Sequence, residues 1–233
     1  MKKIIFGLFV LLLNVVLILN FFDPRIAEYI KVKLKINPEI TLYSKGVNTI
    51  YERMDGSVEK GSTIFLGDSI TQALNVAAIT DKSINYGISG DTTYGLLNRM
   101  DKYNSLNTAN KIVIAIGIND LRYRNKEEII KNFNLILDKL PQNTPILINS
   151  ILPVSGTFID KNKDYSVKKI EEINSELLGL CGKKPSCNYM DNFKLFVDKN
   201  GFLKKEYDIG DGIHLNTKGN QVLIHVLRGN IKN

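Results

Sequence analysis

Short apolar runs alternate with longer amphipathic stretches from residue 62 onward, and this alternation constrains the fold more than any other feature of the sequence. The run at 112–116 (Ile-Val-Ile-Ala-Ile) offers no polar face to water, which is typical of a strand buried on both sides. Strands of this kind, separated by helices, form a parallel sheet between two helical layers. The sequence therefore predicts a three-layer α/β/α sandwich with a central parallel sheet.

The same pattern gives an expected position for each element. Strands are expected at residues 63–66, 83–86, 111–116, 145–150 and 188–190. Helices are expected at residues 72–78, 94–103, 126–140, 163–180 and 217–228. A chain of 233 residues suits a single core, so we expect one domain at 62–233.

A helix is also predicted ahead of this domain. Asn37 can cap it, while Pro38 and Glu39 suit its first turn. Apolar residues then recur every three or four positions until Gly56, a natural stop. These apolar residues are Ile40, Tyr43, Val47, Ile50, Tyr51 and Met54. We expect the helix to pack on the flank of the domain, with residues 23–61 as linker and flanking helix.

Residues 4–22 form an apolar stretch that follows Lys2 and Lys3. As a helix, this stretch would span roughly 28 Å, close to the hydrocarbon thickness of a bilayer. A buried core helix would show a polar face, and a cleaved signal peptide usually has a shorter apolar core and a small-residue cleavage site. Here the run ends in Phe-Phe-Asp-Pro. We therefore expect residues 1–22 to be an uncleaved transmembrane anchor that precedes an exported, extracytoplasmic domain.

The charge of the chain is +7, from 31 basic and 24 acidic residues. The lysines are scattered in short clusters, which favours a solvated surface or an anionic membrane over a nucleic-acid groove. No zinc finger, RNA-binding signature or long basic helix occurs. We therefore expect no nucleic-acid partner.

The chain has two cysteines and two histidines, too few for a metal site of the usual Cys/His kind. Cys181 and Cys187 flank a short turn that contains Gly and Pro. Such a turn can bring the two side chains within disulfide range, and this pairing is plausible outside the cytoplasm. Two inert thiols remain the alternative.

Polar residues follow the expected strands at the places where a parallel sheet binds its ligands, the carboxyl ends of the strands. The first strand ends in Gly-Asp-Ser at 67–69, the second in Gly-Ile-Ser-Gly-Asp at 87–91, and the third in Gly-Ile-Asn-Asp at 117–120. The last loop carries Asp-Gly-Ile-His at 211–214. These segments are therefore expected to form one site.

Ser69 and His214 are the candidates for a nucleophile and its base. A serine nucleophile needs a base within hydrogen-bond reach, and the base needs a third group to orient it. His225 falls in the middle of a predicted helix, whereas His214 has Asp211 three residues before it, close enough to reach the ring. Ser69 has an alternative role as a helix N-cap, but a strand-to-helix turn would also expose its hydroxyl.

An acyl-transfer site also needs donors for the oxyanion that forms. The backbone N–H of Ser69 is one candidate. Gly90 can offer a bare backbone N–H, and Asn119 can donate its side-chain amide without adding a charge. A tight turn at Gly90 and a loop amide at Asn119 are the alternatives.

The other charged residues near these segments have simpler explanations. Asp68 and Asp91 stand at expected helix starts and Asp120 in a loop, where capping and loop hydrogen bonds account for them. Arg99 and Arg122 are expected to be solvated at the surface, with contact to an anionic substrate as the alternative.

Together these segments, in this order, resemble the SGNH hydrolases, also called GDSL-type esterases and lipases. The resemblance covers residues 62 to the C-terminus, and the stretch at 85–93 is most similar to the branch of lysophospholipase-like esterases and platelet-activating-factor acetylhydrolase subunits. It implies a flavodoxin-like strand order and hydrolysis without a metal or other cofactor. The chain has Leu215 where many members have Pro, and Ile70 replaces the Leu of the GDSL name.

The expected function is therefore a serine esterase with an acyl-enzyme intermediate and Ser69, His214 and Asp211 as its triad. The resemblance favours short acyl groups, and the ester could belong to a small molecule, a lipid such as a lysophospholipid, or an acylated glycan. An acyltransferase on the same triad and a non-catalytic surface-binding domain are the alternatives.

Overall fold

A five-stranded parallel sheet forms the centre of the protein in a computed structural model, which describes residues 6–7, 10–11, 14–15 and 39–231. The strands are β1 (Thr63–Gly67), β2 (Ser83–Gly87), β3 (Lys111–Ala115), β4 (Ile146–Asn149) and β5 (Cys187–Met190). Their order, β2-β1-β3-β4-β5, is that of flavodoxin-like sheets. The predicted parallel sheet is confirmed, and each strand lies within about two residues of its expected bounds.

The register of the sheet aligns the ends of its central strands. Gly67 at the end of β1 is paired with Gly87 of β2 on one side and Ala115 of β3 on the other. The chain goes from β1 to β2 on one side and then crosses to β3 on the other, so the strand order reverses at β1. Ligands bind at such a switch point in open α/β sheets.

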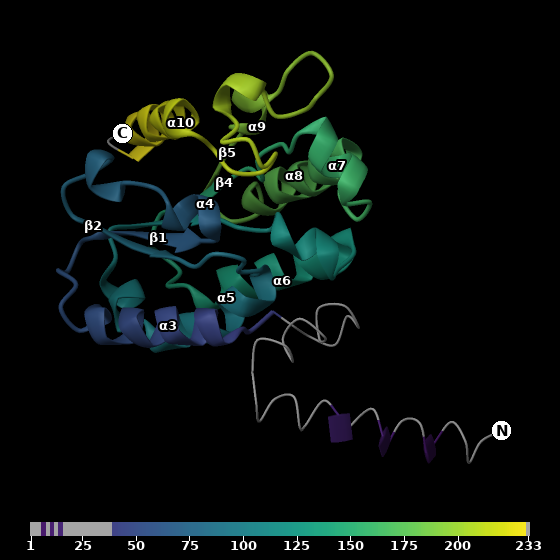
Figure 1. Cartoon of the computed structure of the whole chain (residues 1–233). Coiled ribbons are helices and arrows are strands. Elements are labelled where there is room, and N and C mark those ends of the chain that lie inside the picture. Colours follow the sequence, from purple (N-terminus) through teal and green to yellow (C-terminus); the bar gives the residue numbers. More distant parts are fainter. Residues whose placement is uncertain (1–5, 8–9, 12–13, 16–38, 232–233) are drawn as a thin grey trace. The chain divides into compact units, whose positions relative to one another are not determined.

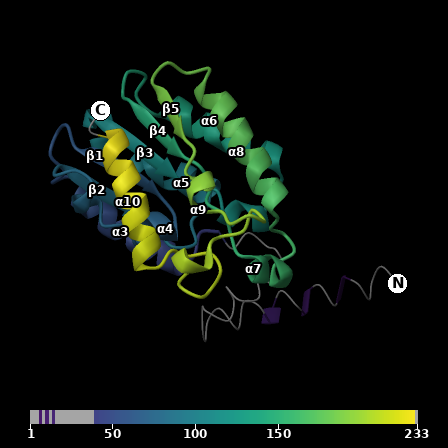
Figure 2. The same ribbon diagram turned by 90° about the horizontal axis from the view of Figure 1, so that it is seen from above.

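Helices cover both faces of the sheet (Figures 1 and 2). One face packs against α3 (Leu42–Asp55), α5 (Thr93–Arg99), α6 (Lys126–Lys139) and α8 (Val167–Cys181). The other face packs against α9 (Phe193–Phe196) and α10 (Thr217–Ile231). Successive strand residues serve opposite layers, since Ile64 lies in the first core and Phe65 in the second. The structure thus confirms the three layers.

Short helices complete the described part of the chain. They are α4 (Ser69–Gln72), α7 (Gly156–Lys161) and the 3-10 turns η1 (Val76–Ala78), η2 (Met100–Lys102), η3 (Asn104–Thr108), η4 (Asn119–Arg122) and η5 (Lys205–Tyr207). The single helix predicted at 72–78 is therefore wrong, because α4 ends at Gln72 and only the short turn η1 follows, at Val76–Ala78. The helix predicted at 163–180 begins only at Val167, where Ser166 caps α8 by accepting a hydrogen bond from the Lys169 N–H.

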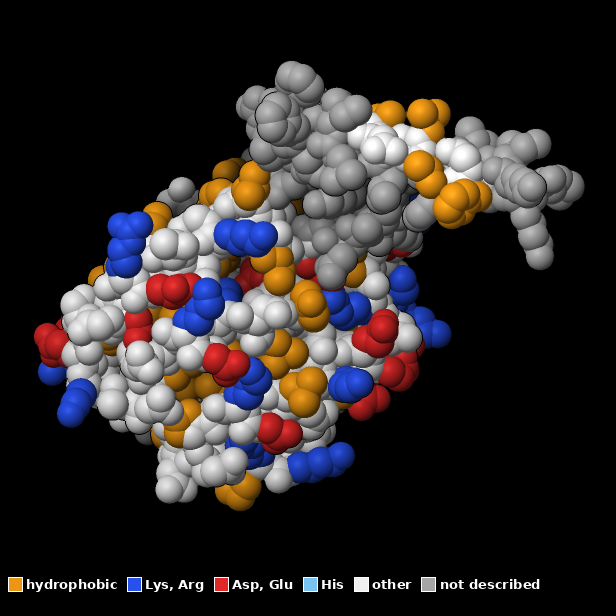
Figure 3. Space-filling model, turned by 90° about the horizontal axis from the view of Figure 1, so that it is seen from below, with side chains coloured by type: hydrophobic (Ala, Val, Ile, Leu, Met, Phe, Trp, Pro, Cys, Tyr) orange, Lys and Arg blue, Asp and Glu red, His pale blue; other side chains and the backbone are white. Residues whose placement is uncertain are grey.

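Helix α3 departs from its prediction in two ways. It begins at Leu42 rather than directly after Asn37, and polar residues join Tyr51 on its inner side while other predicted apolar residues face outward. Ile50 and Met54 are exposed, whereas the polar residues Asn48 and Asp55 are buried. On the face that Figure 3 shows, exposed apolar side chains lie among both basic and acidic side chains.

Buried hydrogen bonds explain why the polar side of α3 turns inward. Asp55 accepts hydrogen bonds from the Tyr86 hydroxyl at 2.9 Å and from the Ser105 side chain. Asn48 accepts one from the Tyr103 hydroxyl at 2.5 Å. Buried polar groups are tolerated when they are hydrogen-bonded in this way. The spacing of apolar residues therefore located the helix, but it did not identify the polar residues on its inner side.

The chain divides into two units, Met1–Leu42 and Tyr43–Asn233, and the fold above is that of the second unit. Among the described residues, no helix is both long enough and apolar enough to cross a bilayer. The predicted membrane helix at 4–22 and the linker after it lie outside the described residues, apart from the three short described stretches at 6–15.

Cys181 and Cys187 form a disulfide. The bond joins the last residue of α8 to the first residue of β5 across a tight turn. Of the two alternatives that the sequence left open, the structure has the paired one.

Candidate active site

Ser69 lies at the sharp turn between β1 and α4. β1 ends at Gly67, and Asp68 is the N-cap of α4, with its side chain accepting a hydrogen bond from the Ile70 N–H at 3.0 Å. Ser69 is the first residue of this short helix and is partly exposed. The turn therefore presents the Ser69 hydroxyl at the carboxyl edge of the sheet, as the sequence predicted.

A second loop brings His214 to the same edge. An antiparallel bridge between Asp208 and Leu215 closes this loop, and the Ile209 N–H donates to the His214 carbonyl at 3.0 Å. Gly212 has a positive φ of 86°, and a Cβ there would lie 2.3 Å from Ser155 Oγ, so only glycine fits. The loop is thus held at its base and against the start of α7.

Ser69, His214 and Asp211 form a continuous chain of hydrogen bonds. His214 Nε2 lies 2.8 Å from Ser69 Oγ, and His214 Nδ1 lies 2.6 Å from Asp211 Oδ2. The other carboxyl oxygen of Asp211 accepts the backbone N–H groups of Ile213 at 3.0 Å and His214 at 2.9 Å. The structure therefore brings together all three predicted triad residues in the geometry of a nucleophile, its base and an orienting acid.

The environment of Asp211 favours its charged form. Partial burial raises the pKa of Asp211, but hydrogen bonds from the backbone and ring of His214 and from the Ile213 N–H outweigh it. The pKa of this carboxyl is accordingly below its ordinary value. The side chains of His214 and Asp211 are 39% and 47% exposed, so both are accessible from solvent.

Gly90 lies in the turn that follows β2. Its φ is 76°, a left-handed conformation that glycine adopts without strain, and a Cβ built there would meet no atom within 4 Å. The Ser89 N–H donates to Gln72 Oε1 at 2.7 Å and ties this turn to α4. Neither the Ser69 N–H nor the Gly90 N–H has an acceptor among the described residues. Both groups are available to a ligand in front of the sheet edge.

Asn119 follows β3 and begins η4, where it is 8% exposed. Its Nδ2 donates one hydrogen bond to the Asp91 carbonyl at 3.0 Å. Because a side-chain amide carries two N–H groups, this bond fixes the amide and leaves the second N–H for another acceptor. The predicted oxyanion residues thus end the three adjacent strands β1, β2 and β3.

Arg99 and Asp91 are not where the sequence placed them. Arg99 is 5% exposed rather than solvated, and its Nε lies 2.8 Å from Asp91 Oδ2. Asp91 is not a cap, because Thr92 is the N-cap of α5 and its hydroxyl accepts the Gly95 N–H at 3.1 Å. Arg122 is exposed, as expected, and donates to the Tyr165 hydroxyl. Sequence reasoning missed the buried pair, since a local capping role already accounted for Asp91.

Asp68, Asp91 and Asp120 are all buried below the site. Asp120 accepts hydrogen bonds from the backbone and side chain of Thr93, at 2.8 and 2.5 Å, and links η4 to α5. Burial, opposed by the Ile70 N–H and reinforced by the two neighbouring carboxyls, raises the pKa of Asp68 to about 7.

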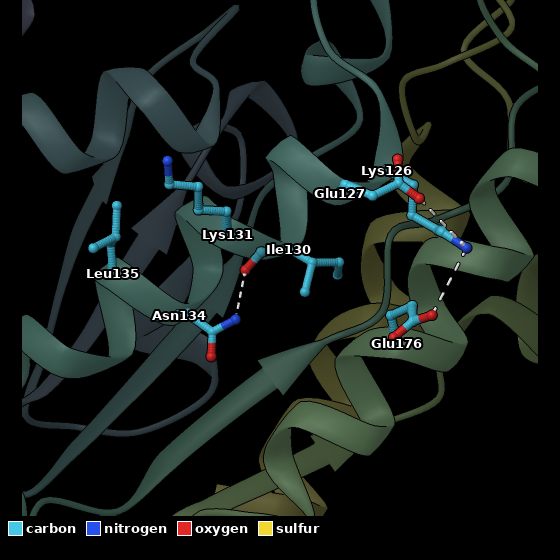
Figure 4. A pocket seen from close by; sticks show the side chains of 7 residues that line it. All are labelled: Lys126, Glu127, Ile130, Lys131, Asn134, Leu135 and Glu176. Atoms are coloured by element: carbon cyan, nitrogen blue, oxygen red, sulfur yellow. Dashed lines mark hydrogen bonds and ion pairs between the residues drawn. The ribbon is translucent and has the colours of Figure 1, made fainter.

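The described residues contain no group of three His, Cys, Asp or Glu side chains that could hold a metal ion. A surface pocket of about 460 Å³ lies elsewhere, along α6 and against Glu176 of α8, where Lys126 and Glu176 form an ion pair at 3.7 Å (Figure 4). None of the triad residues lines it.

Comparison with solved structures supports the fold. A Streptococcus pneumonia protein with the provisional name platelet activating factor is 28% identical, with a TM-score of 0.77 over 87% of this chain and 98% of that one. A GDSL-like lipase from Bacteroides thetaiotaomicron is 20% identical, with a TM-score of 0.67 over 79% and 97% of the two chains. An acetylxylan esterase from Geobacillus stearothermophilus is 17% identical, with a TM-score of 0.58 over 73% and 97%. The last two likenesses show the fold alone.

A search of curated proteins found no match. The model of the GDSL-like lipase/acylhydrolase family, in contrast, matches residues 65–222, which include every predicted site residue from Ser69 to His214. This match covers more than half of the chain. The chain belongs to the GDSL-like lipase/acylhydrolase family, and it is a carboxylic ester hydrolase.

Proposed function

We propose that the protein hydrolyses carboxylic esters with Ser69 as nucleophile, His214 as general base and Asp211 as the group that orients the base. The observation that carries this proposal is the unbroken hydrogen-bond chain from Ser69 Oγ through both ring nitrogens of His214 to Asp211 Oδ2. Acyl transfer requires a nucleophile that is hydrogen-bonded to its base, and a base that is hydrogen-bonded to a carboxylate.

The reaction proceeds in two halves. Ser69 Oγ attacks the ester carbonyl while His214 Nε2 takes its proton, and the tetrahedral intermediate then collapses as His214 returns that proton to the departing alcohol. Water attacks the acyl group on Ser69 with His214 again as the base. The second collapse releases the carboxylic acid and restores the Ser69 hydroxyl. The lowered pKa of Asp211 keeps its charge beside the imidazolium that forms in each half.

The oxyanion of each tetrahedral intermediate is held by the backbone N–H groups of Ser69 and Gly90 and by the side-chain amide of Asn119. Two observations support this assignment. The backbone groups have no acceptor among the residues that the structure describes, and the Asn119 amide is fixed by its bond to the Asp91 carbonyl. Fixed, uncharged donors stabilise the transition state without reorganisation.

The substrate is either an ester with a short acyl group, such as an acetylated glycan, or a lysophospholipid-type lipid. The exposure of His214 and Asp211 supports this choice, because a bulky alcohol can approach an open site. The 28% identical structure, whose provisional name is platelet activating factor, is compatible with the lipid.

Residues 4–22 hold the enzyme at a membrane, and residues 62–233 work outside the cytoplasm. The uninterrupted apolar character of residues 4–22 supports the anchor. The disulfide between Cys181 and Cys187 supports an oxidising compartment, because such bonds persist in exported proteins.

The test compares the full chain in mild detergent with its Ser69→Ala variant on chromogenic esters from acetyl to palmitoyl. We expect Ser69→Ala to lower turnover by about a thousandfold or more, and the native enzyme to prefer short acyl groups. Ser57→Ala is the matched control, because this exposed serine lies beside the amino ends of β1 and β2, at the opposite edge of the sheet from Ser69, and bonds only the Met54 carbonyl. Activity that survives in Ser69→Ala would refute the nucleophile, and a preference for palmitoyl esters would refute the short acyl group.

A further inference from the structure

The buried guanidinium of Arg99 makes hydrogen bonds in three directions. Its Nε donates to Asp91 Oδ2 at 2.8 Å, its Nη2 to the Gly67 carbonyl at 3.2 Å, and its Nη1 to the Tyr103 hydroxyl at 3.1 Å. The side chains of Arg99 and Asp91 are only 6% and 2% exposed. The two residues are therefore shielded from any ligand in solution. They can influence the site only through the groups that they contact.

These contacts reach the end of every strand that carries a proposed oxyanion donor. Gly67 closes β1 two residues before Ser69, and Asp91 directly follows Gly90. The carbonyl of the same Asp91 accepts the hydrogen bond from Asn119 Nδ2 at 3.0 Å. One buried ion pair thus connects the segments that position all three donors.

Arginine suits this place because its planar fork has several donors in fixed directions, whereas lysine offers a single flexible ammonium. A buried ion pair adds little net stability, since the cost of taking both charges out of water offsets their attraction. Stability alone is therefore a poor explanation for the pair. One cation bonds both Gly67 at the end of β1 and Asp91 in the segment after β2. This geometry is better explained by an effect on the shape of the site.

We propose that Arg99 is a positioning residue that, through Asp91 and Gly67, sets the spacing of the Ser69, Gly90 and Asn119 donors around the oxyanion. The inference rests on the proposed esterase mechanism and adds a residue that acts on it from below the site. Arg99 touches neither substrate nor reacting atoms.

Arg99→Lys keeps the charge but removes the fork. Donors that drift by a few tenths of an ångström lose contact with the oxyanion of the transition state more than with the uncharged ester, so kcat should fall while KM stays nearly constant. We expect kcat to fall by roughly tenfold to a hundredfold and KM to stay within about twofold.

A double-mutant cycle separates positioning from general destabilisation. If Arg99 acts through the oxyanion donors, Arg99→Lys should cost much less kcat in an Asn119→Ala background than in the native enzyme. Asp91→Asn, which removes the charge that holds the guanidinium but keeps the shape of the side chain, serves as the second variant if Arg99→Lys does not fold. We expect it to lower kcat with the same coupling to Asn119.

Asp55→Asn is the matched control, because Asp55 is equally buried and bonds the Tyr86 and Ser105 hydroxyls, but has no hydrogen bond to Gly67, Asp91 or Asn119. It should lower the melting temperature and leave kcat within about twofold. Additive losses in the cycle, an unchanged kcat in both pair variants, or an equal kcat loss in Asp55→Asn would overturn the proposal. Ser69→Ala is measured alongside these variants. If Ser69→Ala keeps its activity, the proposed esterase mechanism fails; if Ser69→Ala is inactive, the results above test Arg99 alone.

Discussion

Asp68 shows at the scale of one residue how crowded the floor of the site is. Burial raises the pKa of Asp68 to about 7. The hydrogen bond from the Ile70 N–H lowers this pKa, and the nearby carboxyls of Asp91 and Asp120 raise it. The folded protein therefore holds a proton on Asp68 over a range, roughly pH 4 to 7, in which the unfolded chain has released it. This contribution to stability is complete at low pH and is lost as the pH rises through 7.

Asp68→Asn should remove this pH dependence, because asparagine cannot ionise yet still accepts the Ile70 N–H. Between pH 5 and pH 8 we expect the native protein to lose about 2–3 kcal/mol of unfolding free energy relative to the variant. Urea unfolding at both pH values measures the difference, and Asp164→Asn, at an exposed position, is the control. Parallel curves for native protein and Asp68→Asn would contradict a raised pKa.

At the scale of elements, the sequence predicted the parts of the site that obey a local rule. The strands are continuous apolar runs, and parallel pairing then brings the residues after β1, β2 and β3 to one edge. Ser69, Gly90 and Asn119 could be placed by that rule alone. His214 and Asp211 followed because His225, the other histidine, falls within a helix.

The failed predictions for α3 and Arg99 depend on partners distant in sequence. The inner face of α3 is polar because Tyr86, Tyr103 and Ser105, from β2 and the turns after α5, supply its hydrogen bonds. Arg99 could not be placed for the same reason, since its acceptor at Gly67 lies 32 residues away. Hydrophobic periodicity records burial from water, but it does not identify polar residues that are satisfied inside the protein.

The buried polar residues of α3 predict an unusual stability pattern. Asp55→Ala should cost about 2–4 kcal/mol, because the Tyr86 and Ser105 donors would be left buried without their acceptor. Ile50→Ala, on the exposed face of the same helix, should change stability by less than about 0.5 kcal/mol. Chemical unfolding of both variants compares the two faces directly. A larger loss for Ile50→Ala would mean that the apolar face is the packed one.

At the scale of the whole molecule, the proposed anchor should determine where the enzyme is found. In cells that make the full chain, esterase activity should sediment with membranes and resist a carbonate wash, and deletion of residues 4–22 should release it. Cys181 and Cys187 should resist alkylation until the protein is reduced. Activity of the full chain in the soluble fraction, or a mature N-terminus beyond Phe22, would argue against an uncleaved anchor.

The central claim, that Ser69 is the nucleophile activated by His214, is tested most directly by covalent labelling. An alkyl fluorophosphonate is attacked by an activated serine, whose Oγ forms a bond to phosphorus as fluoride leaves, and the adduct mimics the tetrahedral intermediate. Peptide mass spectrometry should find the phosphonyl group on Ser69 in the native enzyme, with loss of esterase activity in step, and far slower labelling in His214→Ala. A label on another residue, or an unlabelled Ser69 in an enzyme that has lost its activity, would contradict the account.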